Sequence, residues 1–168
     1  MEYFLEGMRK ISFIFIIVGF IGIQIITLIP IYQKEVNKQI VSKIEVGKYN
    51  EKNYYVGYIE VCSIKIPLVY GSGEKELNQN LVGIDNHSTS NHLILAGHAI
   101  KSVFLCLYDV KVDDIIKIKY HNSNYIYYID NKKIVNYTDI SIYNNTGLTL
   151  ITCINKEQRL IVHAKTAS

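Results

Sequence analysis

The chain has 168 residues, 49% of them hydrophobic, and a formal net charge of +3 at pH 7. This length accommodates one domain with a hydrophobic core and little more. The lysines are scattered among Tyr, Asn and Ile and form no dense basic stripe, which argues against a nucleic-acid partner.

An apolar segment without charged side chains covers residues 11–32. A helix of this length, at 1.5 Å per residue, is about 30 Å long and can cross the hydrocarbon core of a bilayer. A cleavable signal peptide would have a shorter apolar region followed by small residues, and neither feature is present. We therefore expect a membrane anchor over residues 11–32, with residues 1–10 before it. Basic residues flank both ends, so charge alone leaves the orientation open.

The polar segment 33–53 is expected to be a stalk, helical near the membrane and loose beyond it. From residue 54 to residue 168, short runs of Ile, Val and Tyr alternate with Gly, Asn, Asp and Ser, a pattern typical of strands. Strands are expected at residues 57–61, 65–70, 92–97, 114–120, 124–130, 133–137, 148–153 and 159–165. This number of short strands indicates a mainly β fold, a closed or nearly closed barrel. Short helices are expected at 74–81 and 100–108.

The three cysteines lack the short Cys-x-x-Cys spacing of a zinc or redox site. Cys62 lies between two expected strands and Cys106 in an apolar helical stretch, so both are interpreted as packing residues. Cys153 ends an apolar strand at a polar segment and lies close in sequence to Arg159, whose charge would stabilise a thiolate. A buried, unreactive thiol is the alternative for Cys153.

A histidine and an arginine complete a candidate site around Cys153. His98 follows Gly97 at the end of an apolar strand, so its ring can project from the barrel rim. Arg159 opens the strand after Cys153, so its guanidinium can reach a carbonyl that the sulfur attacks, although an ordinary solvent-exposed arginine is the alternative. A nucleophile, a proton carrier and an oxyanion partner are the groups that acyl transfer needs.

The other four histidines are weaker candidates. His87, His92 and His121 lie among Asn and Ser and are expected on the solvated surface. His163 alternates with Arg159 along the last expected strand, which places both on one face if no bulge intervenes. His163 is therefore the reserve candidate for the acid or base.

Three motifs together resemble the sortases, the membrane-anchored cysteine transpeptidases of Gram-positive bacteria. Residues 149–153, Thr-Leu-Ile-Thr-Cys, are similar to the Thr-Leu-x-Thr-Cys strand of that family. Residues 159–162, Arg-Leu-Ile-Val, resemble its arginine strand, and residues 95–98, Leu-Ala-Gly-His, its histidine motif. The similarity covers roughly residues 56–165. The short spacing between motifs leaves no room for the long insertion of class B, so we expect a compact form and leave the class open.

The resemblance implies an eight-stranded sortase β-barrel behind a transmembrane helix, with residues 1–10 cytoplasmic and residues 54–168 outside the cell. It implies that the substrates are secreted precursor proteins with a C-terminal sorting signal of the Leu-Pro-x-Thr-Gly type. The enzyme would cleave the signal between Thr and Gly and transfer the acyl group to an amine of a peptidoglycan precursor, which anchors surface proteins to the cell wall.

The resemblance also assigns roles to individual residues. Cys153 would attack the threonyl carbonyl, and Arg159 would hold the carbonyl oxygen and the developing oxyanion. His98 would protonate the departing amine and later deprotonate the incoming one. Thr152 would help to shape the substrate groove, which the segment 135–147 would bound. That chemistry needs no cofactor and no metal ion.

Three other functions stay open at the level of the sequence. A membrane-anchored cysteine peptidase would use the same Cys153 and His98 and release its product to water. A pilin-polymerising sortase would use a pilin lysine as the acceptor. A non-enzymatic binding module would not depend on Cys153 at all.

Overall fold

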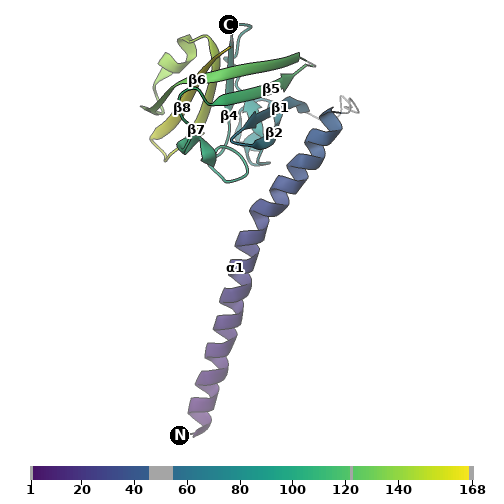
Figure 1. Cartoon of the computed structure of the whole chain (residues 1–168). Coiled ribbons are helices and arrows are strands. Elements are labelled where there is room, and N and C mark those ends of the chain that lie inside the picture. The colour runs from purple at the N-terminus through teal and green to yellow at the C-terminus, as the bar shows by residue number, and fades with distance from the viewer. Residues whose placement is uncertain (1, 46–54, 122, 167–168) are drawn as a thin grey trace. The chain divides into compact units, whose positions relative to one another are not determined.

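The computed structural model describes residues 2–45, 55–121 and 123–166 (Figure 1). It divides into two compact units, Met1–Glu35 and Val36–Ser168. Helix α1 (Glu2–Glu45) is a single helix of 44 residues. The segment expected to be a stalk, 33–53, is therefore helical as far as Glu45, and its remainder lies outside the described residues.

Along α1, eight large apolar side chains between residues 18 and 32 are each more than half exposed: Val18, Phe20, Ile23, Ile26, Leu28, Ile29, Ile31 and Tyr32. Among the described residues, no helix meets the length and hydropathy that crossing a bilayer requires.

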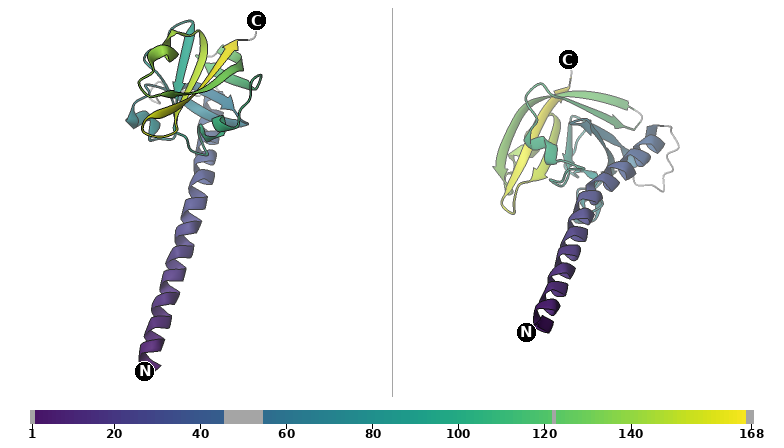
Figure 2. Two further views of the ribbon diagram at one scale, coloured as in Figure 1. Left: turned by 90° about the vertical axis from the view of Figure 1, so that its left-hand side faces the viewer. Right: turned by 60° about the horizontal axis from the view of Figure 1, so that its bottom comes forward.

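The second unit contains an eight-stranded closed barrel, as the sequence predicts (Figures 1 and 2). Its strands are β1 (Tyr55–Val61), β2 (Ile64–Tyr70), β3 (Val82–Ile84), β4 (His92–Ala96), β5 (Ile115–Tyr120), β6 (Ser123–Asn136), β7 (Gly147–Cys153) and β8 (Gln158–Thr166). Around the barrel their order is β1-β2-β3-β4-β7-β8-β6-β5. The pairs β2–β3 and β4–β7 are parallel and the other pairs are antiparallel.

Strand β7 is buried on both faces, which explains its nearly continuous apolar sequence. Leu148 and Leu150 point into the barrel and join its main core, in which Phe104 is among the largest fully buried side chains. Ile151 belongs instead to a second cluster. The buried members of this cluster come from β4, β6, β7, β8 and the connection between β6 and β7: Ile94, Val135, Ile142, Ile151 and Ile161.

The strand count agrees with the prediction, but two strands differ from it. The strands expected at 124–130 and 133–137 are one strand, β6, whose register against β8 shifts at a bulge between Ile129 and Asn131. The extra residue at the bulge reverses the alternation of inward-facing and outward-facing side chains. In the sequence, this reversal looks like the end of one strand and the start of another. Strand β3 has only three residues, all buried, and is too short to show a period.

The expected helices are shorter than predicted. Helix α2 covers Glu74–Leu77 only, and the segment 100–108 consists of turns followed by the 3₁₀ helix η1 (Leu105–Tyr108). A further 3₁₀ helix, η2 (Ile140–Asn144), lies between β6 and β7. In the 100–108 segment the helix-like apolar spacing comes from Val103, Phe104 and Leu107, which fill the barrel interior without forming an α-helix.

Cys62 and Cys106 form a disulfide, so their interpretation as separate packing residues is wrong. Cys62 and Ser63 form the two-residue turn between β1 and β2, and both have positive φ, as a tight hairpin requires. Cys106 lies in η1. The two cysteines are 44 residues apart in sequence, and only the closure of the barrel brings the turn and η1 together.

Candidate active site

Cys153 and Arg159 lie opposite each other at one end of the β7–β8 pair. The next pair towards the turn, Ile154 and Gln158, shares a backbone hydrogen bond of 3.0 Å. Cys153 and Arg159 are therefore a non-hydrogen-bonded antiparallel pair, the kind in which facing side chains lie closest, with Cβ atoms about 4.5–5.5 Å apart. The guanidinium stem and the sulfur start from neighbouring positions on the same face of the sheet.

The turn between the two residues is closed by a side chain that the sequence did not single out. Asn155 Oδ1 accepts hydrogen bonds from the backbone N–H groups of Glu157 and Gln158, both at 2.8 Å. Its Nδ2 donates to Gln158 Oε1 at 3.0 Å. An asparagine in a polar turn is a recognisable signal for this arrangement. Asn155 thus fixes the hairpin that holds Cys153 opposite Arg159.

His98 lies at the same end of the sheet, one residue beyond Gly97. The parallel register of β4 and β7 pairs Ala96 with Ile151, and Gly97 N–H continues it by donating to the Ile151 carbonyl at 3.1 Å. Continuing this register places His98 beside Cys153 at the carboxyl ends of the two strands. Ala96 and Ile151 both belong to the second cluster, outside the barrel. His98 and Cys153 each stand two residues further along the chain, so their side chains are on that outer face as well.

The chain after His98 folds back over the same end of the barrel. The His98 carbonyl accepts hydrogen bonds from the N–H groups of Ile100 at 2.9 Å and Phe104 at 3.1 Å. At Gly97, an added Cβ would lie 2.7 Å from Phe104 Cδ2 and 2.8 Å from Val103 Cγ1. The close approach of these side chains requires glycine before the histidine, which gives the Gly-His sequence a structural reason.

Helix η1 packs beside β7, the strand that ends at Cys153. The Tyr108 hydroxyl donates to the Cys153 carbonyl at 3.4 Å. From the β6 bulge, Lys132 Nζ donates to the carbonyls of Tyr108 at 3.0 Å and Val110 at 2.8 Å. Together with the disulfide at Cys106, these contacts hold η1 next to Cys153.

Exposure distinguishes the candidates named from the sequence. Cys153 is a free, exposed thiol, and His98 and Arg159 are partly buried. Thr152 is fully buried, on the barrel-facing side of β7, and its hydroxyl has no hydrogen-bond partner among the described residues. The structure therefore brings Cys153, His98 and Arg159 together at one rim and places Thr152 beneath them.

His163 shares a face with Arg159, as predicted, but stands four residues further along β8. At about 3.3 Å per residue this separation is about 13 Å, which is too far for proton exchange with Cys153. His163 contacts Asp130 and the Thr146 carbonyl instead. The reserve role as acid or base is not supported by this position.

Of the three histidines expected on the surface, His87 and His121 are exposed, but His92 is buried. His92 is 2% exposed, and its Nε2 lies 2.7 Å from the Thr149 hydroxyl. Burial lowers the pKa of His92, a shift that the backbone of Tyr143 partly opposes and the charge of His163 reinforces. The polar neighbours in sequence were misleading because His92 begins β4 beneath the β6–β7 connection.

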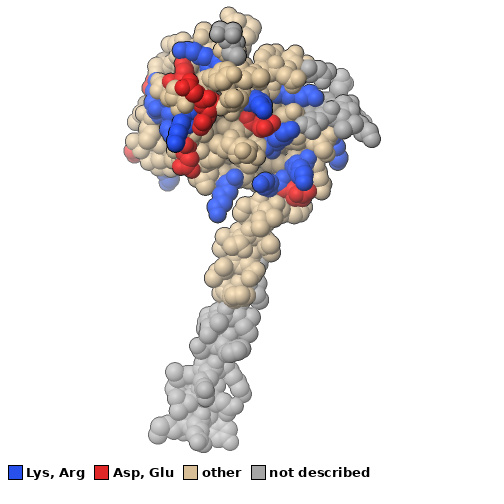
Figure 3. Space-filling view, viewed as in Figure 1, with Lys and Arg blue, Asp and Glu red and all other residues tan. Residues whose placement is uncertain are grey.

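Lys and Arg side chains are mixed with Asp and Glu over the visible face of the barrel unit (Figure 3). This face shows no continuous stripe of positive charge, consistent with the dispersed lysines in the sequence.

The fold and the rim site define a class of protein: a closed β-barrel that presents an exposed cysteine opposite an arginine and beside a histidine. The model of the sortase domain matches residues 58–167, and the chain belongs to the sortase family. The family assignment agrees with the resemblance of the three sequence motifs.

Several solved structures share the fold. Sortase C1 from Streptococcus agalactiae is 28% identical, with a TM-score of 0.62 over 81% of this chain and 86% of that one. Sortase C1 of Pilus Island 1 from Group B Streptococcus is 24% identical, with a TM-score of 0.63 over 68% of this chain and 65% of that one. Sortase A of Listeria monocytogenes is 22% identical, with a TM-score of 0.60 over 69% and 89%. No curated protein matches the chain.

Proposed function

We propose that the chain is a cysteine transpeptidase that cleaves a C-terminal sorting signal of the Leu-Pro-x-Thr-Gly type and transfers the acyl group to an amine. The observation that carries the proposal is the meeting of three groups at one barrel rim. Cys153 is exposed, it faces Arg159 across a non-hydrogen-bonded pair, and the parallel register brings His98 beside it.

In the first half of the reaction the Cys153 thiolate attacks the threonyl carbonyl and forms a carbon–sulfur bond. The Arg159 guanidinium donates to the oxygen on which negative charge develops. As the carbon–nitrogen bond breaks, protonated His98 gives its proton to the departing glycyl amine. The product is a thioacyl intermediate on Cys153 and a neutral His98.

In the second half an incoming amine attacks the thioacyl carbon. His98 accepts the proton of this amine, the new amide forms, and Cys153 leaves as a thiolate. The acyl group ends on the acceptor, and the enzyme returns to its starting protonation state. Water in place of the amine would give the hydrolysis-only peptidase.

The acceptor we propose is an amine of a peptidoglycan precursor, so that the reaction anchors surface proteins to the cell wall. A pilin lysine is the second candidate, because one of the similar structures is described as a sortase of a pilus island and another as a Streptococcus pneumoniae sortase C with pilin substrate specificity. A competition assay distinguishes the two candidate acceptors. An amine from the wall precursor and a pilin domain compete for the thioacyl enzyme, and the mass of the product identifies the acceptor.

We further propose that residues 11–32 anchor the enzyme and that the barrel lies outside the cell. The exposed apolar side chains along α1 support an apolar environment for the helix. The disulfide between Cys62 and Cys106 supports an oxidising compartment, since such bonds persist outside the cytosol and are rare within it.

The test uses the full-length chain, a sorting-signal peptide and a short glycine peptide as the amine, with products read by mass. We expect the acyl fragment joined to the glycine peptide. Arg159→Gln should lower the rate about 10²–10³-fold, as the loss of an oxyanion donor does. Lys156→Gln is the matched control, because it removes a positive charge from the same hairpin without facing Cys153, and it should keep the wild-type rate. Equal losses in both variants would refute the role of Arg159.

A further inference from the structure

The connection between β6 and β7, residues 137–146, crosses the outer face of the sheet that carries the rim site. At its start, Asp139 Oδ1 accepts a hydrogen bond from Ser141 N–H at 2.8 Å. At its middle, Ile142 is buried in the second cluster with Ile151 and Ile161. At its end, Thr146 leads directly into β7, the strand that terminates at Cys153. The position of this connection therefore depends on how each of these three points is held.

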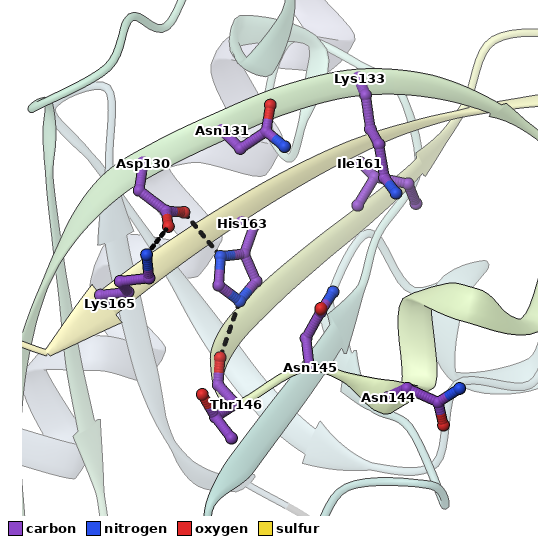
Figure 4. Close-up of a pocket in the computed structure, with 9 residues that line it drawn as sticks. All are labelled: Asp130, Asn131, Lys133, Asn144, Asn145, Thr146, Ile161, His163 and Lys165. Atoms are coloured by element: carbon purple, nitrogen blue, oxygen red, sulfur yellow. Dashed lines mark hydrogen bonds and ion pairs between the residues drawn. The ribbon is translucent and has the colours of Figure 1, made fainter.

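His163 holds the end of the connection to the sheet. Its Nε2 lies 2.7 Å from the Thr146 carbonyl oxygen, and its Nδ1 lies 2.6 Å from Asp130 Oδ1. Lys165 Nζ lies 2.7 Å from the other oxygen of the same carboxylate. Figure 4 shows the ring of His163 between Asp130 on one side and Thr146 on the other, with Lys165 at the second oxygen of the carboxylate.

The geometry fixes which atoms donate. A carbonyl oxygen only accepts, and an ionised carboxylate only accepts, so both ring nitrogens of His163 must donate for the bridge to be complete. The bridging ring then carries two protons and a positive charge. Burial acts to raise the pKa of Asp130, but the hydrogen bonds from Lys165 and His163 outweigh it and hold that pKa below its ordinary value. Asp130 is thus the ionised partner that this bridge requires.

The ring of His163 and its bond to Asp130 are partly buried, whereas Thr146, at the other end of the bridge, is exposed. The His163 side chain is 14% exposed and that of Lys165 is 68% exposed, so of the two bonds to Asp130 the one from His163 is less screened by solvent. Beside the bridge lies a cavity of about 390 Å³, lined by Asn131, Lys133 and residues 144–146 among others. The end of the connection lines this cavity. Next to Thr146, the Gly147 N–H donates to the Asn91 carbonyl at 2.7 Å, and the hydrogen bond from His163 holds the carbonyl of Thr146 itself.

We propose that His163 is a positioning residue of the substrate groove. By bridging Asp130 on β6 to the Thr146 carbonyl, it fixes the end of the β6–β7 connection and thereby the wall that the connection presents to the sorting signal. His163 touches neither the substrate nor the reacting atoms. The inference rests on the proposed function for what the connection contacts, and on the contacts above for how the connection is held.

The test compares three variants of the full-length chain. His163→Gln has a neutral amide whose two N–H donors share one nitrogen, so it cannot replace donors at both Nδ1 and Nε2, and the connection should loosen. His163→Arg keeps a charged side chain with several donors, and the neighbouring cavity has room for its length, so it should restore the bridge. His121→Gln is the matched control, because it removes an exposed histidine from the β5–β6 turn, away from the connection.

Two measurements are made on each variant. Amide hydrogen exchange without substrate reports how firmly residues 137–146 are held, and steady-state kinetics with a sorting-signal peptide separate KM from kcat. We expect His163→Gln to speed exchange in 137–146 and to raise KM about tenfold, the equivalent of one charge-assisted hydrogen bond, with kcat little changed. We expect His163→Arg and His121→Gln to match the wild type in both.

Either of two results would overturn the inference. Unchanged exchange in His163→Gln would show that the ring does not hold the connection. Faster exchange with an unchanged KM would show that the connection does not position the substrate. A wild-type enzyme that acts on no sorting-signal peptide would instead refute the proposed function, and the exchange measurement would then refute or support the bridge without any substrate.

Discussion

The disulfide between Cys62 and Cys106 should contribute much of the stability of the barrel. The bond closes a loop with a sequence separation of 44 residues. In the chain-entropy description, a loop of that length destabilises the unfolded state by about 4 kcal/mol. The thermal unfolding midpoint of a domain of this size falls by about 4 °C for each kcal/mol of stability lost. Reduction of the disulfide should therefore lower the midpoint by about 15 °C.

Thermal unfolding followed by circular dichroism measures this shift, with and without a phosphine reductant. The protein should carry Cys153→Ala, because Cys153 is the free thiol and could otherwise exchange with the disulfide. The control adds Cys62→Ser and Cys106→Ser to the same background. It should unfold near the reduced midpoint whether or not reductant is present.

Alkylation of the unfolded wild-type chain provides an independent count. One thiol should react before reduction and three after it, as expected for the Cys62–Cys106 bond and a free Cys153. Three reactive thiols without reductant, or a midpoint that the reductant leaves unchanged, would refute the reasoning.

Three further predictions concern the rim, the charge network and the anchor. Gly97→Ala should destabilise the barrel by about 1–3 kcal/mol, the usual cost of overpacking, and should slow the reaction, because the new Cβ meets Phe104 and Val103 beside His98; wild-type stability and rate would contradict this close packing. The low pKa of Asp130 means that its ionised form stabilises the fold above the ordinary carboxyl pKa and that this contribution is lost as pH falls. When the pH is lowered from about 6 to about 3, the thermal midpoint of Asp130→Asn, measured by circular dichroism, should therefore fall less than that of the wild type. Equal falls would argue against the network of Asp130 with His163 and Lys165. Residues 11–32 should keep the full-length chain in the membrane pellet after alkaline carbonate extraction; recovery in the supernatant would count against the anchor.

The sequence predicted the barrel well because most strands leave a periodic signal. Alternation and turn residues placed seven of the eight strands, and the apolar run before Cys153 correctly indicated a strand, which the structure shows to be buried on both faces. The missed strand, β3, has three residues and no measurable period. The β6 bulge split one strand into two in the prediction because an inserted residue reverses the alternation.

The rim residues could be predicted because they stand at strand ends next to polar turns. The contacts that support them could not, since they join segments distant in sequence. Cys62 and Cys106 meet only after the barrel closes, and buried His92 lies against Thr149 of β7 and the backbone of Tyr143 in the β6–β7 connection. The bridge from His163 to Asp130 depends on a register that no local pattern determines.

Trapping the thioacyl intermediate tests most directly whether Cys153 is the nucleophile of an acyl transfer. The full-length chain is mixed with a library of sorting-signal peptides without an amine acceptor, quenched in acid and digested for mass spectrometry. We expect an adduct on Cys153 that ends at the threonine of the signal, is lost on addition of an amine and is absent from Cys153→Ala. No adduct with any peptide, or one on another residue, would contradict it.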